Sequence, residues 1–244
     1  MLADAEQANI ITVAVTELPS RFQLLQAQLR GRTRLRIALG FHPLARPTSR
    51  AHELGLFRRL LSRTDYVGEV GLDRSTQGSD SIAQQRETFE AILALPGIRQ
   101  KVLTVHSRRA EAETVASLLE AEATAILHWY SGPLGPLERA LAGGLYFSVN
   151  GAMLKSRNGQ RIIAALPRER VVTETDGPYT KTGRRASEPS DIPDVVAALA
   201  ERWGLTPQEA RDSIFATMSD LHRRATVERG GELSRPKPTG VGPT

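Results

Sequence analysis

A regular alternation of apolar strands with amphipathic helices constrains the fold more than any other feature of this sequence. Short runs rich in β-branched and aliphatic residues recur along the chain, separated by stretches of helical periodicity. The runs are Ile10–Thr16, Leu35–Pro43, Tyr66–Asp73, Lys101–Ser107, Thr124–Gly132, Leu145–Gly151 and Arg170–Pro178. Because strands that are apolar on both faces are buried on both faces, this pattern predicts a parallel sheet covered by helices.

Helical stretches fill the intervals between these strands. The expected helices are Pro19–Arg30, Ala51–Ser62, Ser79–Leu95, Ala110–Ala121, Leu134–Leu141 and Gly159–Leu166, with a further helical segment, Leu2–Asn9, before the first strand. A chain of 244 residues suits one barrel of the TIM type, which commonly takes about 250 residues and closes on eight strands. Since seven strands are recognisable, the expected fold class is α/β, a TIM-type (β/α) barrel that lacks its first strand.

The last third of the chain changes character. Asp191–Trp203 and Thr206–Thr217 read as paired helices, the second of them capped by Thr206. Residues 225–244 are rich in Gly, Pro and charge and hold too little apolar surface to fold. We therefore expect a barrel domain over residues 1–224 and a disordered tail over residues 225–244.

The composition narrows the chemistry and the compartment. The chain holds no cysteine, so disulfides and thiolate metal sites are excluded, and any metal would be held by His and carboxylate side chains. No apolar run approaches the roughly 18 residues of a membrane span. The N-terminus also lacks a secretory signal pattern, so the cytoplasm is the expected compartment. A net charge of +5 favours acidic or phosphorylated partners, although the arginines are spread along the chain.

Ionisable side chains stand where the buried strands end. They are His42, Glu69, Asp73, His106, His128 and Asp176. In a barrel of parallel strands these ends meet at one mouth, where such barrels carry their chemistry. One buried His or carboxylate is commonly a hydrogen-bonded core residue, but several at the same end of consecutive strands indicate a shared site. Their oxygen and nitrogen donors suit Zn²⁺, Mn²⁺ or Mg²⁺, so the sequence predicts a metal centre at the mouth.

Other polar residues near the strand ends are candidates for substrate binding. Arg108 follows the fourth strand and Lys155 follows the sixth, where each could meet a phosphate or simply face solvent. Tyr130 could stack on a base at the rim or pack in the core. His42, at the end of the second strand, is also assigned to substrate. No Gly-x-Ser-x-Gly elbow supports a serine nucleophile.

Several segments resemble the TatD-like metal-dependent deoxyribonucleases. These segments are GFHP, GEVGLD, the helix start SDSIAQQRETFE, TVHSR, LHWYSG, SVNGAML and TETDGP, and the resemblance covers about residues 9–224. It implies a TIM-type barrel of the amidohydrolase kind that binds one or two divalent cations, Mg²⁺, Mn²⁺ or Zn²⁺. It places metal ligands on Glu69, His106, His128 and Asp176, with Glu69 and Asp176 also catalytic. The implied activity is hydrolysis of phosphodiester bonds in DNA, as a 3′-to-5′ exonuclease.

The segments SVNGAML and TETDGPY are especially similar to the QatD subfamily, the TatD-like members of a bacterial anti-phage cassette. This likeness implies antiviral defence beside companion proteins of that cassette. The sequence departs from the family most seriously at its start, since members open with a strand that ends in H-x-H and no H-x-H occurs here. A lesser departure is the replacement of the family's Asn in the final helices, around Thr217–Asp220. We expect the given chain to be a shortened form of a longer protein. The alternative is a natural degenerate form that binds nucleic acid or a partner without cutting.

Three functions stay open on the sequence. The first is a metal-dependent deoxyribonuclease, and the basic charge near the mouth favours it. The second is an amidohydrolase-like metalloenzyme that acts on a small non-phosphate substrate. The third is a catalytically weak scaffold subunit, which the missing H-x-H suggests. Replacing Asp176 with Asn separates catalysis from a scaffold role. Loss of cleavage with retained folding supports catalysis, whereas an unchanged phenotype supports a scaffold role.

Overall fold

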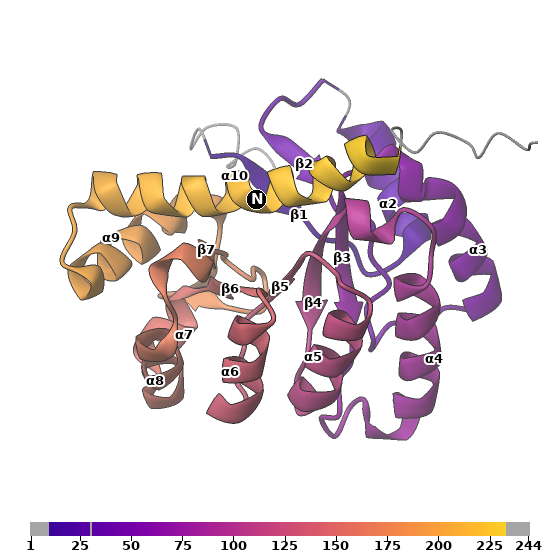
Figure 1. The fold of residues 1–244 in the computed structure, drawn as a ribbon, viewed down its shortest axis with the longest axis horizontal. Helices are drawn as coiled ribbons and strands as arrows, with labels where there is room; N and C mark the ends of the chain where they lie inside the picture. Colours follow the sequence, from indigo (N-terminus) through magenta and orange to yellow (C-terminus); the bar gives the residue numbers. More distant parts are fainter. Residues whose placement is uncertain (1–9, 30, 233–244) are drawn as a thin grey trace, which may run out of the picture.

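Seven parallel strands form the wall around which the described part of the chain is built (Figure 1). The structure, a computed structural model, describes residues 10–29 and 31–232. The strands are β1 (Thr12–Ala14), β2 (Leu35–Ile37), β3 (Tyr66–Gly71), β4 (Val102–His106), β5 (Ala125–Leu127), β6 (Tyr146–Val149) and β7 (Val171–Thr173). Each lies inside a segment that the sequence predicts to be a strand, so all of these predictions are confirmed, with shorter bounds.

The strands pair in the order of the sequence. β3 to β7 form one sheet, β1 pairs with β2, and a parallel bridge between Leu39 and Val67 joins the two parts. The register sets Gly71 beside His106 and Val149 beside Thr173. Because neighbouring strands run parallel in matched register, their carboxyl ends lie at one edge, as in a (β/α) barrel.

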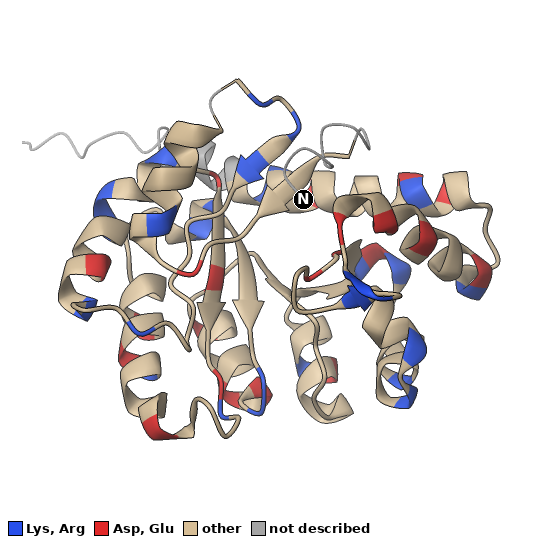
Figure 2. Ribbon diagram, turned by 180° about the vertical axis from the view of Figure 1, so that it is seen from behind, with Lys and Arg blue, Asp and Glu red and all other residues tan. Residues whose placement is uncertain are grey.

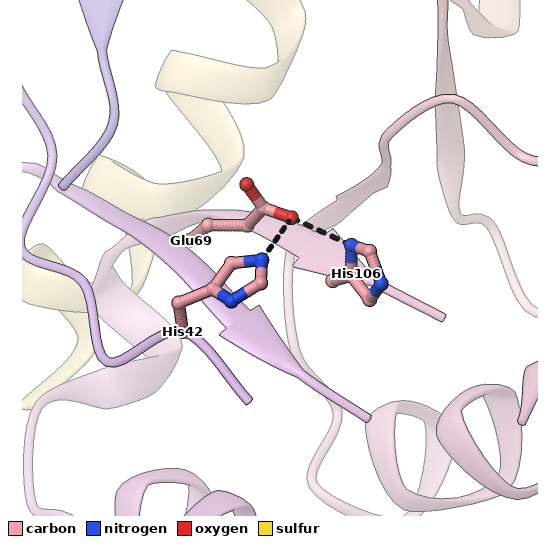
Figure 3. Close-up of side chains that lie close together, drawn as sticks. All are labelled: His42, Glu69 and His106. Carbon is pink, nitrogen blue, oxygen red and sulfur yellow. Dashed lines mark hydrogen bonds and ion pairs between the residues drawn. The ribbon is translucent and has the colours of Figure 1, made fainter. Parts of the chain in front are cut away.

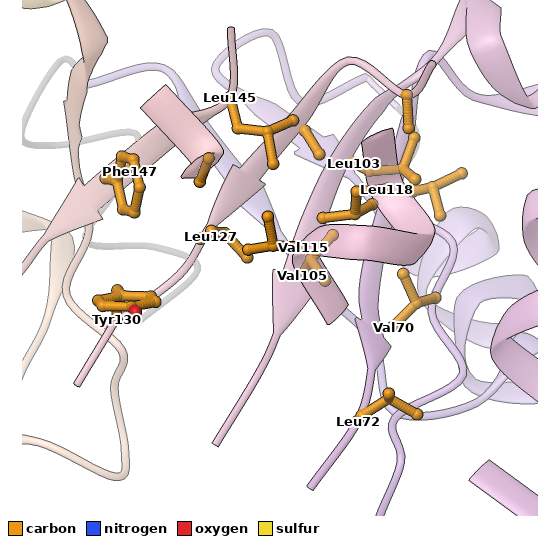
Figure 4. Packing of buried hydrophobic residues seen from close by; sticks show 14 of the residues in the cluster. Val70, Leu72, Leu103, Val105, Val115, Leu118, Leu127, Tyr130, Leu145 and Phe147 are labelled. Carbon is orange, nitrogen blue, oxygen red and sulfur yellow. The ribbon is translucent and has the colours of Figure 1, made fainter. Parts of the chain in front are cut away.

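Amphipathic helices cover the outer face of this wall. They are α2 (Pro19–Gln28), α3 (Arg50–Leu60), α4 (Ile82–Leu93), α5 (Glu111–Glu120), α6 (Leu134–Ala142) and α8 (Arg157–Ala165). Leu103 and Val105 of β4 pack in one buried cluster with Val115 and Leu118 of α5 (Figure 4). Successive strand residues point to opposite faces, so the intervening residues of β4 face the interior of the barrel.

The inner face is apolar at the amino ends of the strands and polar at their carboxyl ends. Its apolar cluster consists of Val102, Ile126, Tyr146, Val172, Leu221 and Ala225. The last two belong to α10 (Pro207–Glu232), which follows α9 (Ile192–Trp203) and crosses the amino ends of the strands (Figure 1). The helix α10 therefore covers the apolar half of the interior, and the polar half is left to the mouth.

The course of α10 corrects one prediction. The disordered tail was predicted to begin at residue 225, but the helix continues to Glu232. Leu221 and Ala225 are buried against the strands, so the helix is still packed at the predicted boundary. The predicted cap is confirmed: the Thr206 hydroxyl accepts a hydrogen bond from Glu209 N at 3.3 Å, and the Glu209 carboxylate accepts one from Thr206 N at 2.8 Å. Residues 233–244, like the helical segment predicted over Leu2–Asn9, lie outside the described residues.

Two short elements at the mouth were not predicted. The helix α7 (Gly151–Lys155) begins directly after β6, because the Asn150 side chain accepts hydrogen bonds from Ala152 N and Met153 N, both at 3.0 Å. An antiparallel hairpin of β8 (Lys181–Thr182) and β9 (Arg185–Ala186) follows β7. Within the described part of the chain, no helix combines the length and apolar composition of a membrane span.

Candidate metal centre

Three imidazoles converge on one carboxylate oxygen at the mouth of the barrel. Glu69 Oε1 lies 2.8 Å from His106 Nδ1, 2.9 Å from His128 Nε2 and 3.4 Å from His42 Nε2. Figure 3 shows His42 and His106 turned toward the same oxygen of Glu69. Glu69 and His128 are 9% and 8% exposed, so the cluster lies at the base of the mouth, within reach of solvent from one side.

Two glycines allow the strands that carry these residues to approach one another. A Cβ on Gly40 would lie 1.6 Å from the carbonyl oxygen of Thr16, so only glycine fits between β1 and β3 at this point. A Cβ on Gly71, whose φ is +130°, would lie 2.0 Å from the carbonyl oxygen of His106. These close approaches bring the ends of β2, β3 and β4 together and so bring His42, Glu69 and His106 together.

A second set of contacts fixes the orientation of the His106 ring. Asp73 Oδ2 lies 2.7 Å from His106 Nε2, which leaves Nδ1 directed at Glu69. The backbone N–H of Asp73 donates to Gln85 Oε1 at 2.7 Å, and Gln85 Nε2 donates to the Asp73 carbonyl at 3.1 Å. Burial opposes ionisation of Asp73, but hydrogen bonds from His106 and Ser75 lower its pKa to about 2. Such a carboxylate–imidazole pair is the usual support of a metal-binding histidine.

Glu174 orients the second imidazole, that of His128, as Asp73 orients that of His106. It lies one residue past β7 and accepts hydrogen bonds from the Ser148 hydroxyl at 2.6 Å, Asn150 Nδ2 at 3.0 Å and Trp129 N at 3.0 Å. Its Oε2 lies 3.3 Å from His128 Nδ1, and the opposite ring nitrogen of His128 points to Glu69. Glu174 therefore ties β5, β6 and β7 together behind the centre and sets the orientation of His128.

Asp176 lies beside this cluster without joining it. Its Oδ1 is 3.8 Å from His128 Nδ1, and its backbone is left-handed, with φ 51°. Burial, opposed by His128 and reinforced by Glu174 and Glu69, raises the pKa of Asp176 to about 7. Among the described residues its carboxylate accepts no hydrogen bond. It is the least engaged carboxylate at the mouth, which leaves it available to a ligand.

Comparison with known proteins agrees with this geometry. Residues 1–222 match the family described as TatD related DNase. The chain belongs to that family. A protein of Edwardsiella piscicida named 3′-5′ ssDNA/RNA exonuclease TatD is 37% identical over 150 residues, which are 56% of this chain and 57% of that protein. A protein of the same name from Pantoea vagans is 29% identical over 201 residues, 76% of this chain and 77% of that one. The chain thus spans little more than half the length of the first of these relatives.

Solved structures confirm the predicted architecture. A TatD homologue from Escherichia coli superposes with a TM-score of 0.79 at 23% identity, and the match covers 90% of this chain and 89% of that one. At this level of identity the likeness concerns the fold. The TatD-family chain is therefore an α/β barrel of the TIM type, as the strand–helix alternation and the resemblance predict.

The donor set of this TatD-family chain fits a divalent cation. Ligand atoms of His42, Glu69 and His106 lie within 4.8 Å of one another, and imidazole nitrogen with carboxylate oxygen is a set that Zn²⁺ and Mn²⁺ accept. Burial opposes ionisation of Glu69, but the facing His128 and His106 outweigh it and hold the pKa of Glu69 well below its usual range. A carboxylate that stays ionised under burial is what a bound cation requires.

The pKa values of His106 and His128 are raised, whereas that of Glu69 is lowered. Burial opposes their protonation, yet Asp73 and Glu69 raise the pKa of His106, and Glu69 and Glu174 raise the pKa of His128 well above its usual range. The carboxylates of the centre therefore attract positive charge strongly enough to overcome desolvation. A divalent cation meets that demand with the imidazoles neutral, which is their ligating form.

The residues predicted to bind substrate lie in three different surroundings. His42 lies within the donor set, so its nitrogen can serve a metal as well as a substrate. Arg108 and Lys155 are exposed beside the carboxyl ends of β4 and β6. Tyr130 does not reach the rim: it is 1% exposed, donates a hydrogen bond to Pro133 O, and packs edge-on against Phe147 (Figure 4). The prediction for Tyr130 is wrong, because the turn after β5 directs its ring into the core.

Two residues of the site were not predicted from the sequence. Glu174 had a signal, since Val172, Glu174 and Asp176 alternate along one strand and so share a face. Tyr179 had none beyond its place after Asp176, and it is the exposed aromatic residue of the mouth, with 73% of its surface accessible.

Proposed function

We propose that this TatD-family chain is a divalent-cation-dependent nuclease that hydrolyses phosphodiester bonds of single-stranded DNA from the 3′ end. The observation that carries the proposal is the convergence of His42, His106 and His128 on Glu69 Oε1 at a mouth open to solvent. The exposed cations Arg108 and Lys155 support a phosphate-bearing substrate over a small neutral one. The printed name of the bacterial relatives, 3′-5′ ssDNA/RNA exonuclease, supports the direction and the strandedness.

The roles follow from the surroundings of each residue. Glu69, His106, His128 and His42 would hold the cation, with Asp176 completing its shell. When bound, a divalent cation polarises the phosphodiester and makes a water molecule a better nucleophile. Asp176, whose carboxylate accepts no hydrogen bond among the described residues, is placed to accept the proton that this water releases. The other residues of the site position these groups: Asp73 and Glu174 hold the two buried imidazoles.

The test compares the wild-type protein with Asp176→Asn on a 5′-labelled single-stranded oligonucleotide in the presence of Mn²⁺ or Mg²⁺. We expect stepwise shortening from the 3′ end by the wild type, and a loss of at least about 100-fold in the variant, the scale of one general base. Circular dichroism and Mn²⁺ binding check that the variant stays folded and loaded. Cleavage at the wild-type rate by Asp176→Asn, or none by either protein, would contradict the proposal. Preference for an RNA oligonucleotide would revise the substrate.

We further propose that this nuclease acts in antiviral defence within an anti-phage cassette. The support is the likeness of SVNGAML and TETDGPY to QatD, and the two segments meet at one point of the site, where Ser148 and Asn150 bind Glu174. In a host that carries the cassette, the wild-type gene should restrict phage plating and Asp176→Asn should not. Equal plating on both strains would remove this part of the proposal and leave the nuclease intact.

A further inference from the structure

Tyr179 bridges the rim of the mouth from the last strand of the barrel to the first. It lies three residues after Asp176, and its hydroxyl donates to Glu17 Oε1 at 3.3 Å, the carboxylate that follows β1. The Glu17 carbonyl in turn accepts a hydrogen bond from His42 N at 2.8 Å. The phenol is thus linked through Glu17 to the backbone of His42, and along the chain to Asp176.

The ring itself is open to solvent although its tip is held. Tyr179 is 73% exposed, whereas the other tyrosines of the described chain are wholly or partly buried. Partial burial of the hydroxyl raises its pKa, and the charges of Glu17, Glu69 and Asp176 raise it further. An apolar ring held at one end and exposed over its faces suits stacking against a planar ligand.

A cationic hairpin continues from this tyrosine. Thr180 O accepts a hydrogen bond from Ser187 N at 3.0 Å and closes the β8–β9 turn. Arg185 anchors the hairpin through two contacts to Asp191, at 2.9 and 2.5 Å. Lys181 and Arg184 are exposed, and neither has a side-chain partner among the described residues. In Figure 2, where Lys and Arg are blue, blue ribbon gathers on a short hairpin beside the strands. The structure therefore holds the hairpin in place and leaves two of its positive charges available.

We propose that Tyr179 and the β8–β9 hairpin form the strand-binding platform of this nuclease: Tyr179 stacks on the nucleobase next to the scissile phosphate, and Lys181 and Arg184 bind phosphates of the adjoining nucleotides. The ligand class is single-stranded nucleic acid, because a base within a duplex is stacked between its neighbours and has no free face to offer to the ring. This inference rests on the proposed function and adds the residues that select an unpaired strand.

The first test separates the ring from its hydroxyl. Binding of a short 5′-fluorescein-labelled oligothymidylate is measured by fluorescence anisotropy in EDTA, where no cleavage occurs. Tyr179→Leu should weaken binding by about 10-fold to 100-fold, the scale of one stacked base. Tyr179→Phe keeps the ring and removes the Glu17 contact, so its affinity should stay within about twofold of wild type, well inside one stacking contact. Phe215→Leu, at an exposed aromatic residue of α10, is the matched control and should change nothing.

The second test asks whether the base is what Tyr179 contacts. An oligothymidylate whose 3′-terminal sugar lacks its base should bind the wild type about 10-fold or more weaker than the intact strand. Tyr179→Leu should bind the two strands alike, because the ring that distinguishes them is gone. A penalty of equal size in both proteins would show that another group contacts the base.

The third test addresses the hairpin. The double variant Lys181→Ala/Arg184→Ala should lower the slope of log affinity against log salt by about 1.4, the loss of two phosphate contacts on a single strand. Arg58→Ala/Arg59→Ala removes two exposed arginines from the carboxyl end of α3 and should leave the slope unchanged. An unchanged slope in the hairpin variant would overturn its assignment.

The outcomes also separate this inference from the proposed function. Methyl p-nitrophenyl phosphate is a phosphodiester without a nucleobase, so its hydrolysis by the wild type with Mn²⁺ tests the proposed function without any base for Tyr179 to stack on. Stacking would be overturned if Tyr179→Leu bound the oligothymidylate as tightly as the wild type, or if Tyr179→Phe lost as much affinity as Tyr179→Leu. Hydrolysis of the ester by the wild type would in that case still support the proposed function. If the wild type cleaves neither the ester nor the oligonucleotide, the proposed function and the inference that rests on it are both overturned.

Discussion

Glu69 shows how much of this site is decided by single side chains. It is a buried carboxylate that would be costly alone, and it stays ionised because three imidazoles face one of its oxygens. Those imidazoles are themselves oriented by Asp73 and Glu174. The sequence predicted Glu69, His106 and His128 at one mouth. It did not predict which atoms would face one another, because that depends on ring orientations set by residues from other strands.

Gln85 is the residue on which the support of His106 depends, and Gln85→Ala tests it. The side chain is 1% exposed and binds both the N–H and the carbonyl of Asp73. Its loss leaves these buried groups unpaired, which should cost about 2–4 kcal/mol of unfolding free energy and lower Mn²⁺ affinity by about 10-fold to 100-fold. Urea unfolding and calorimetric titration measure the two effects.

Gln84→Ala is the control for this substitution, since Gln84 is exposed on the same helix. It should leave both the unfolding free energy and the Mn²⁺ affinity near their wild-type values. If Gln85→Ala lowers stability but not metal affinity, the glutamine supports the loop alone and has no part in orienting His106.

At the scale of elements, α10 supplies apolar side chains to the barrel interior, which is usually filled by the side chains of the strands alone. Leu221 and Ala225 fill the space between Val102, Ile126 and Tyr146 at the amino ends of the strands. Tyr146 also donates to Asp220 Oδ2 at 2.6 Å, and Arg224 Nε donates to the same oxygen at 2.8 Å. The sequence predicted the start of this helix at Thr206 but not its length, because its own periodicity does not show which strands it will cover.

Leu221→Ala measures what this covering contributes. The side chain is fully buried, so its truncation leaves a cavity between the helix and the strands and should lower the unfolding free energy by about 2–5 kcal/mol. Phe215→Ala, on the exposed side of the same helix, should stay within about 0.5 kcal/mol of wild type. Chemical denaturation of both variants checks the pair, and equal losses would mean that α10 does not seal the inner face.

At the scale of the whole molecule, the metal centre joins elements that are far apart in the sequence. His42 follows β2, Glu69 lies in β3, His106 ends β4, and His128 follows β5. A cation bound by all of them links most of the barrel wall, so binding should stabilise the fold as a unit. The stabilisation is then a property of the folded barrel, since the unfolded chain does not bring these donors together.

Addition of Mn²⁺ to protein treated with EDTA should therefore raise the melting temperature. At a concentration about 100-fold above the dissociation constant, the gain is about 2.7 kcal/mol, or roughly 5–11 °C for a domain of this size. Differential scanning fluorimetry measures the shift, and Glu69→Gln should remove most of it. A shift of the same size in Glu69→Gln would place the stabilising ion elsewhere.

The sequence by itself determined the strand–helix alternation, the parallel sheet and the set of ionisable residues at its carboxyl edge. These follow from local periodicity and from the rule that parallel strands end at one mouth. Only the tertiary structure decided that Glu174 and Gln85 orient the histidines, that Tyr130 is buried while Tyr179 is exposed, and that α10 covers the inner face. The physical reason is that each of these depends on contacts between segments distant in the chain, and local periodicity carries no record of those contacts.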